Sequence, residues 1–130
     1  MPHDPRKSLH DMLRASRLAL QFTAGRQQAD YLNDELLRAA VERELEIIGE
    51  ALNRLFKSVP DLADQISERR AIIQFRNVLA HAYDIVDDKL VWGIVEVKLP
   101  ILIAQLELML AALDGSSNGS PPPGEQLQVD

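Results

Sequence analysis

The longest regular pattern in the sequence is a line of apolar residues spaced as one face of a helix. Its members follow one another at intervals of 4, 4, 3, 4 and 3 residues: Leu37, Val41, Leu45, Ile48, Leu52 and Leu55. This spacing is typical of a helix packed lengthwise on a partner, and no alternating strand pattern competes with it. The sequence therefore predicts helices packed on helices, with this apolar seam in their common core.

Comparable patterns on either side of the seam predict further helices. Asp4 followed by Pro5 is typical of a helix start, and Asn33 and Asp87 can each cap a later helix. Pro100 lies inside the last helix and should kink or interrupt it, because its ring removes a hydrogen bond and crowds the preceding turn. The predicted ranges are 5–24, 27–32, 34–58, 60–66, 68–83 and 88–113.

The composition fits an all-α fold in a single domain. Apolar residues make up 46% of the 130 residues and aromatic ones only 5%, so aliphatic side chains must form most of the core. A chain of this length has room for one modest core. After residue 113 the composition changes to mostly Gly, Ser and Pro. We therefore expect a helical domain over residues 1–113 and a disordered tail over residues 114–130.

Charge and cysteine content argue against several classes of protein. The net charge of −6 disfavours a protein that coats nucleic acid by general attraction, although it leaves room for a local basic site. Without cysteine, neither disulfides nor thiolate metal sites can form. The longest apolar stretch, residues 99–113, is interrupted by Gln105 and Glu107 and is too short to span a bilayer. No signal peptide opens the sequence, so we expect a soluble, cytoplasmic protein.

Three carboxylates share one face of the seam helix, where a metal site has to be weighed against a solvated surface. Glu42, Glu46 and Glu50 follow one another at four-residue intervals. Carboxylate-bridged metal sites in helical bundles also use Glu-x-x-His pairs, and no Glu in this sequence has a His three residues later. We therefore expect a solvated or salt-bridged face and no bound metal.

One segment, RNVLAHAY at residues 76–83, brings together a strong base, an imidazole and a phenol. Its polar members are Arg76, Asn77, His81 and Tyr83. Chance gives an Arg-x4-His pair with a frequency of roughly 0.2 per chain, and requiring a Tyr two residues later lowers this to roughly 0.004. The segment is therefore the candidate functional site.

The spacing within this segment indicates that the site needs two copies of the chain. Arg76 and His81 point about 140° away from each other on an unbroken helix. Ile73 and Ala80 form an apolar strip between the two polar stripes. A second copy packed across that strip could bring Arg76 of one chain near His81 of the other. We therefore expect a homodimer with a composite cleft.

Without a metal, these residue types suit cleavage of RNA by its own 2′-hydroxyl. Histidine can move the proton, arginine can neutralise charge that grows on the phosphorane, and Asn77 can orient either group. A structural interpretation is also open. In it, Arg76 pairs with a surface carboxylate, His81 caps a helix end and Tyr83 packs half-buried.

With this motif, the sequence resembles the HepT-like toxins of the HEPN superfamily. That superfamily shares Arg-x4–6-His with a polar residue after the Arg, which in the HepT branch extends to Arg-x4-His-x-Tyr. The matching positions are Arg76, Asn77, His81 and Tyr83. Further matches are LEIIGEALNRL at 45–55, VW at 91–92 and LP at 99–100. The resemblance extends from about residue 6 to residue 113.

The resemblance implies a HEPN-type bundle of four to five helices, a homodimer with paired motif helices, and a metal-independent endoribonuclease without a cofactor. It makes Arg76 and His81 catalytic, Asn77 supportive and Tyr83 the site of modification. It also implies a partner, an MntA-like minimal nucleotidyltransferase antitoxin, which inhibits the toxin by transferring AMP from ATP to that tyrosine. Ala82 departs from the Gly that many relatives have at this position, and its methyl group could re-aim Tyr83.

A second hypothesis keeps this fold without the activity. In it, the chain is a helical adaptor that uses the scaffold only to dimerise or to hold a nucleotidyltransferase. The intact motif favours the enzyme, and incubation of the purified protein with RNA distinguishes the two.

Overall fold

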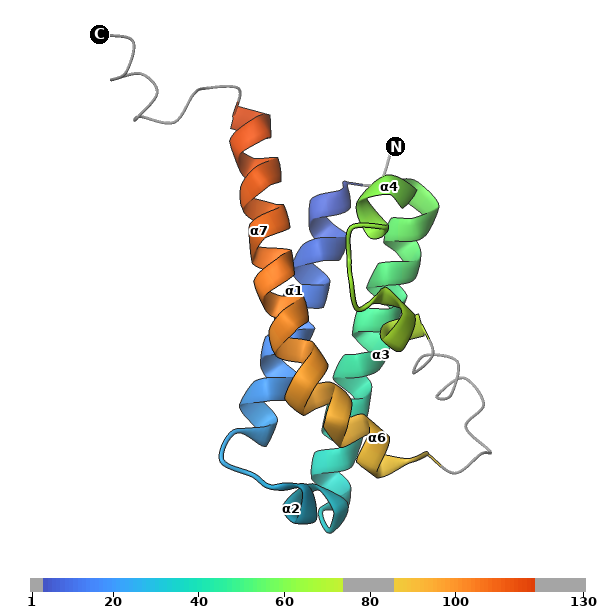
Figure 1. Ribbon diagram of the computed structural model, residues 1–130, viewed down its shortest axis with the longest axis vertical. Helices are drawn as coiled ribbons and strands as arrows, with labels where there is room; N and C mark the ends of the chain where they lie inside the picture. Colours follow the sequence, from blue (N-terminus) through green and yellow to red (C-terminus); the bar gives the residue numbers. More distant parts are fainter. Residues whose placement is uncertain (1–3, 74–85, 119–130) are drawn as a thin grey trace, which may run out of the picture.

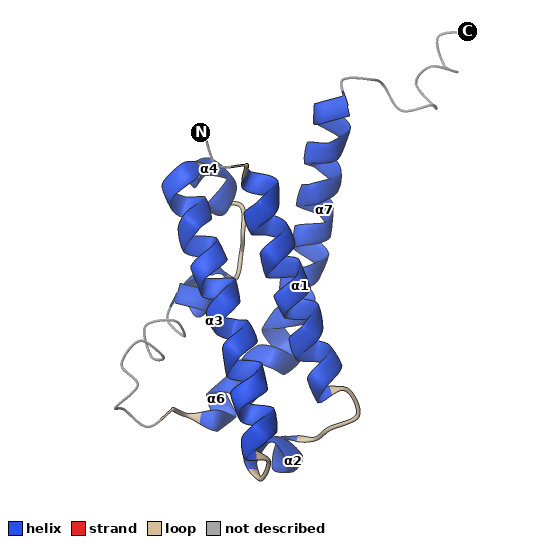
Figure 2. Cartoon of the chain, turned by 180° about the vertical axis from the view of Figure 1, so that it is seen from behind, coloured by secondary structure: helices blue, strands red, loops and turns tan. Residues whose placement is uncertain are grey.

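The three long helices of the protein form one bundle. The computed structural model describes residues 4–73 and 86–118, with side chains to residue 115. Within these residues every regular element is a helix, which confirms the all-α prediction. The long helices are α1 (Pro5–Thr23), α3 (Glu35–Ser58) and α7 (Leu99–Asn118). Helix α1 lies between the other two and packs against both (Figure 2).

Short helices join the long ones at both ends of the bundle. Helix α2 (Gln28–Leu32) follows α1, and α4 (Pro60–Ala63) follows α3 at the opposite end of the molecule (Figure 1). Gly25 turns the chain between α1 and α2 with φ of 75°, a conformation that glycine adopts without a steric penalty. Helix α6 (Asp88–Gly93) begins the last part of the chain and contacts α2.

The seam predicted from the sequence forms the centre of the bundle. All six of its residues are at most 7% exposed, and they meet the buried face of α1. Full burial of an aliphatic side chain of this size contributes about 1.5–3 kcal/mol to folding. The α1 residues on the opposite side are Leu9, Met12, Leu13, Ala15 and Ala19.

Aspartate side chains cap the starts of α1, α3 and α6. Asp4 accepts a hydrogen bond from the Arg6 amide at 2.9 Å, as predicted for the first helix. Asp87 caps α6, also as predicted. The predicted cap Asn33 is wrong by one residue, because the Asp34 carboxylate accepts the Leu37 amide at 3.0 Å. Asn33 instead ends α2.

The last helix is interrupted just before its proline, as predicted. Between α6 and α7, residues Ile94–Lys98 form a π-helical turn, η1. The Leu99 amide there donates to the Ile94 carbonyl, five residues back. Pro100 has no amide hydrogen to continue the usual ladder, and the wider turn accommodates this defect. Helix α7 then continues to Asn118, whereas we expected its end near Leu113. None of the helices in the two described ranges is long and apolar enough to cross a membrane.

Candidate functional site

The candidate site is carried by the segment that follows α4. After Ala63 the chain makes a turn, buries Ile66 completely and becomes helical again over residues 69–73. The four predicted site residues come next: Arg76, Asn77, His81 and Tyr83. They lie in residues 74–85, outside the described part of the chain, so their roles stay predictions. The described residues 64–73 show how the rest of the protein holds the start of this segment.

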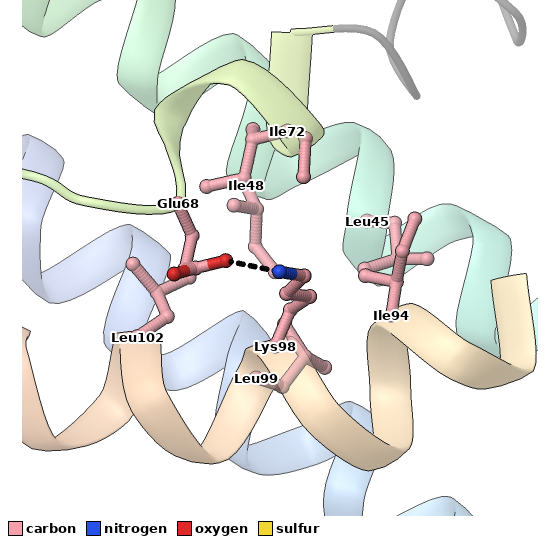
Figure 3. A pocket seen from close by; sticks show the side chains of 9 residues that line it. Leu45, Ile48, Glu68, Ile72, Ile94, Lys98, Leu99 and Leu102 are labelled. Atoms are coloured by element: carbon pink, nitrogen blue, oxygen red, sulfur yellow. Dashed lines mark ion pairs between the residues drawn. The ribbon is translucent and has the colours of Figure 1, made fainter.

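The apolar side of the segment packs between α3 and the last helix. Ile72 is 7% exposed and faces Leu45 and Ile48 of α3 and Leu99 and Leu102 of α7 (Figure 3). The cavity among these side chains measures about 10 Å³, which is about the room that one water molecule needs. This surface is therefore a packing interface and has no space for a nucleotide.

An ion pair closes the edge of this interface. Lys98 Nζ, at the end of η1, lies 3.1 Å from the carboxylate Oε1 of Glu68 (Figure 3). The Glu68 side chain is only 14% exposed, whereas that of Lys98 is 44% exposed. A largely buried carboxylate needs a charged or hydrogen-bonding partner, and here the last residue of η1 supplies it.

A glutamine of α7 binds the backbone on both sides of Ile66. Gln105 Oε1 accepts hydrogen bonds from the Ser67 amide at 2.8 Å and from the Ser67 hydroxyl at 3.3 Å. Its Nε2 donates to the Gln65 carbonyl at 2.6 Å. Both ends of the amide are therefore used by the turn that begins the motif-bearing segment.

Two adjacent arginines of the segment have different environments. Arg69 donates to the Ile66 carbonyl at 3.0 Å and lies 4.0 Å from the Asp64 carboxylate. Arg70 is exposed and makes no hydrogen bond or ion pair within the described residues. Arg69 therefore serves the local turn, while Arg70 offers a cation to solvent close to the predicted site.

The sequence matches outside the motif lie in α3, α6 and α7. The stretch 45–55 is the central part of α3 and supplies Leu45 and Ile48 to the interface with Ile72. The VW pair is buried in α6, where the Trp92 ring lies 5.5 Å from the ring of Tyr31. The apolar residues of these matches are therefore part of the packed scaffold.

A polar cluster lies where α2, α3 and α6 meet. Burial raises the pKa of the Tyr31 phenol, and the carboxylates of Glu42 and Asp88 raise it further. Burial also raises the pKa of Glu42, with Asp88 adding to the effect and Arg38 opposing it. The Arg38 guanidinium Nε lies 3.6 Å from Asp88. In residues 4–73 and 86–118, no three His, Asp or Glu side chains come close enough to hold a metal ion together.

Sequence reasoning did not find the contacts that hold the segment. In the sequence Gln105 is distinctive only because it interrupts an apolar stretch, and this interruption is the one signal of its role. Gln105 is half-buried, and its amide offers both a donor and an acceptor to a neighbouring segment. The identity of that segment, 38 residues away, could not be read from spacing.

The fold and the motif together define a class of protein: a helical bundle whose sequence carries an Arg-x4-His-x-Tyr motif directly after a segment that packs against α3 and α7. A family model agrees with this class. The model described as "HepT-like: Ribonuclease HepT-like" matches residues 12–109. The chain therefore belongs to the HepT-like ribonuclease family, which confirms the resemblance seen in the sequence and assigns the protein to the endoribonucleases.

Individual relatives agree with this assignment. The chain is 34% identical over 99 residues to "Probable ribonuclease HepT" of Thermococcus cleftensis, covering 76% of this chain and 89% of that one. It is 28% identical over 106 residues to "Putative RNase MJ1380" of Methanocaldococcus jannaschii, covering 82% of this chain and 96% of that one. No solved structure gives a significant match to the chain.

Proposed function

We propose that the protein is a metal-independent endoribonuclease that cleaves RNA through attack of the 2′-hydroxyl. The observation that carries this proposal is the intact Arg76-x4-His81-x-Tyr83 motif in a chain of the HepT-like ribonuclease family. Each of these residue types suits a step of that reaction, and none of the steps needs a nucleophile from the protein.

In the proposed reaction the 2′-oxygen bonds to the adjacent phosphorus while the bond from phosphorus to the 5′-oxygen breaks. The 2′-hydroxyl gives up its proton, and the leaving 5′-oxygen takes one. The products are a 2′,3′-cyclic phosphate and a 5′-hydroxyl. His81 moves protons near neutral pH, Arg76 neutralises the charge on the phosphorane, and Asn77 orients one of these groups by a hydrogen bond.

The proposed active site lies between two copies of the chain. Arg76 and His81 diverge on a straight helix, so one copy cannot direct both at a single phosphate. Ile73, at the end of the described segment, supports a homodimer because it is apolar and yet 38% exposed. A partner copy packed on this side would cover it.

We further propose that the protein is the toxin of a toxin–antitoxin pair, controlled by AMP transfer to Tyr83. The partner would be a minimal nucleotidyltransferase of the MntA type, as the family resemblance implies. The burial of Tyr31 supports Tyr83 as the acceptor, because these two are the only tyrosines in the chain and Tyr31 is 0% exposed. An enzyme cannot reach the Tyr31 hydroxyl without opening the bundle.

The activity is tested with purified protein, total RNA and excess EDTA. Arg76→Ala and His81→Ala should each reduce cleavage by about a hundredfold or more, since they remove charge stabilisation and proton transfer. The exposed residues Arg43 and His10 supply matched controls, and Arg43→Ala and His10→Ala should keep full activity. Cleavage that persists in both motif variants would refute the site, and no cleavage by any form would favour the adaptor.

The proposed control is tested by incubation with the nucleotidyltransferase, ATP and Mg²⁺. Mass spectrometry should find increments of about 329 Da, roughly the mass of an AMP residue, on the peptide that contains Tyr83. Tyr83→Phe should keep at least part of its activity and escape inhibition, because the block comes from the attached group. An increment on Tyr31, or a Tyr83→Phe variant that ATP and the partner still silence, would contradict the assignment.

A further inference from the structure

We propose that two side chains of the last helix region, Gln105 and Lys98, are positioning residues for the catalytic motif. The proposal rests on the ribonuclease function proposed above. Both residues reach across to the start of the motif-bearing segment, Gln105 to the turn at Gln65 and Ser67 and Lys98 to Glu68. They therefore connect η1 and α7 to the chain just before the motif.

The apolar contacts alone define the orientation of the segment poorly. Ile72 packs against aliphatic side chains, and such contacts are non-directional, so the segment could rotate or slide on them at small cost. Hydrogen bonds and ion pairs depend on direction and distance. The contacts of Gln105 and Lys98 supply this directional part of the interface.

The amide of Gln105 fits its position in a way that a carboxylate of the same shape would not. Its carbonyl oxygen accepts from the Ser67 amide, while its amino group donates to the Gln65 carbonyl. A glutamate of the same shape would keep the acceptor and lose the donor, and its charge would face the carbonyl oxygen of Gln65. The wild-type side chain thus fixes the backbone on both sides of buried Ile66.

A small change in the orientation of this turn would displace residues further along the segment by a larger distance. On the helix that the sequence predicts over residues 68–83, Arg76 would lie roughly 14 Å beyond Ser67. A tilt of about 5° at the start would move it by about 1 Å, and displacements of about 1 Å can cost an enzyme about a hundredfold in rate. The turn that Gln105 and Lys98 hold is therefore a place where the fold can set the catalytic geometry.

The first test compares Gln105→Glu with Glu107→Gln. Glu107 lies two residues further along α7 and pairs with Arg17 of α1, so it is a matched control on another side of the helix. We expect Gln105→Glu to lower kcat by at least about fivefold with KM changed less than about twofold. Glu107→Gln should leave both unchanged. Equal kinetics in Gln105→Glu and wild type would overturn the role of Gln105.

The second test uses charge exchange. Lys98→Glu should lower kcat by placing two carboxylates together, and the double variant Glu68→Lys with Lys98→Glu should recover most of the loss. Recovery is not expected if Lys98 acts only by its own bulk or charge. A double variant no better than Lys98→Glu would overturn the role of the pair. This test also decides the proposal if Gln105→Glu fails to fold.

A third measurement does not depend on ribonuclease activity. The ring resonances of His81 in NMR spectra report the surroundings of the motif, and His10 supplies an internal reference. We expect His81 to shift in Gln105→Glu and to stay unchanged in Glu107→Gln. If the wild type cleaves no RNA but His81 shifts, the proposed function fails and the positioning survives. If His81 is unmoved in Gln105→Glu and in Lys98→Glu, the positioning proposal is wrong.

Discussion

Tyr31 shows how one buried hydroxyl can affect stability. Its side chain is 0% exposed, its ring packs near Trp92, and its hydroxyl has no hydrogen-bond partner among the described residues. A buried polar group without a partner costs about 1–3 kcal/mol. Tyr31→Phe keeps the ring and removes the hydroxyl. We therefore expect it to raise the free energy of unfolding by about 1 kcal/mol in urea denaturation near neutral pH.

Tyr31→Phe should also change how the stability of the fold depends on alkaline pH. The folded-state pKa of Tyr31 is raised, so the unfolded chain releases this proton first, near its ordinary pKa of about 10. The wild type should therefore lose stability as pH rises above about 10, and Tyr31→Phe should lack this part of the loss. A Tyr31→Phe protein that is less stable than wild type at every pH would mean that the hydroxyl is well satisfied.

Substitutions of the adjacent arginines Arg69 and Arg70 should have different effects, one on stability and the other on RNA binding. Arg69→Gln loses the bond to the Ile66 carbonyl and should lower stability by about 1 kcal/mol. Arg70 is free of protein partners in the described residues and would share a helix stripe with Asn77 and His81. We expect Arg70→Gln to keep its melting temperature, raise KM for RNA and reduce the salt dependence of binding by about one ion.

Arg69→Gln serves as the control for Arg70→Gln, because the two arginines are adjacent. Salt titrations of RNA binding and thermal melts are measured on both variants. If Arg70→Gln has a lower melting temperature than wild type and binds RNA normally, Arg70 is structural and the expected contact with phosphate does not exist.

Residue types and spacing were enough to find the motif, but not the side chains that hold it. Arg76, His81 and Tyr83 stand out because their combination is rare by chance. The sequence does not show what Gln105 and Glu68 bind, because their partners lie far along the chain. Such contacts depend on how helices cross, which periodicity does not specify.

At the scale of elements, periodicity predicted the helices well and their ends less well. The seam of α3 identified a buried face, because its spacing repeats over six residues of one helix. The caps were harder, since Asn33 and Asp34 are both good capping residues and only the geometry selects Asp34. The end of α7 was missed because a helix can continue through polar residues when its earlier turns are well packed.

Two carboxylates, Asp34 at the cap of α3 and Glu42 within α3, should respond to acid in opposite ways. The Leu37 amide, helped by Arg26, lowers the pKa of Asp34, while burial raises that of Glu42. Asp34 therefore stabilises the fold above its unfolded pKa of about 3.9, and this contribution is lost as pH falls through the folded value. Ionised Glu42 lowers stability above its unfolded pKa of about 4.3, so the fold gains relative stability as Glu42 is protonated.

Melting temperatures measured over the acid range test the direction of the stability change expected for each carboxylate. Asp34→Asn should melt below wild type near neutral pH, and Glu42→Gln should melt above it. Both differences should shrink toward about pH 3 as the wild-type carboxyls take up protons. A Glu42→Gln protein that melts below wild type at neutral pH would show that its carboxylate is well compensated by Arg38.

At the scale of the whole molecule, several apolar side chains of the described residues remain exposed, and two of them lie on surfaces that a dimer contact could use. Ile73, 38% exposed, precedes the motif, whereas Leu108, 73% exposed, lies on the outer side of α7. The proposed dimer uses the first surface. We therefore expect Ile73→Lys to shift the protein toward monomer in sedimentation measurements, and Leu108→Lys to leave the dimer intact. Dissociation by Leu108→Lys alone would place the dimer contact on α7.

The chain sequence predicted an all-α domain and its family, because both depend on patterns within one chain. Dimerisation and the antitoxin depend on surfaces of two molecules, so for these the sequence offers only Ile73, Ala80 and the family resemblance. The tail after Asn118 likewise lies outside the described residues, and its disorder stays a prediction from composition.

The central claim is that two copies of the chain form one ribonuclease site, with Arg76 from one copy and His81 from the other. The most direct measurement mixes two inactive proteins, Arg76→Ala and His81→Ala, allows their subunits to exchange, and assays RNA cleavage in EDTA. Half of the randomly paired dimers would be mixed, and each mixed dimer would hold one intact site of two. The account predicts recovery to about one quarter of wild-type activity. No recovery, with mixed dimers demonstrated by native mass spectrometry, would contradict it.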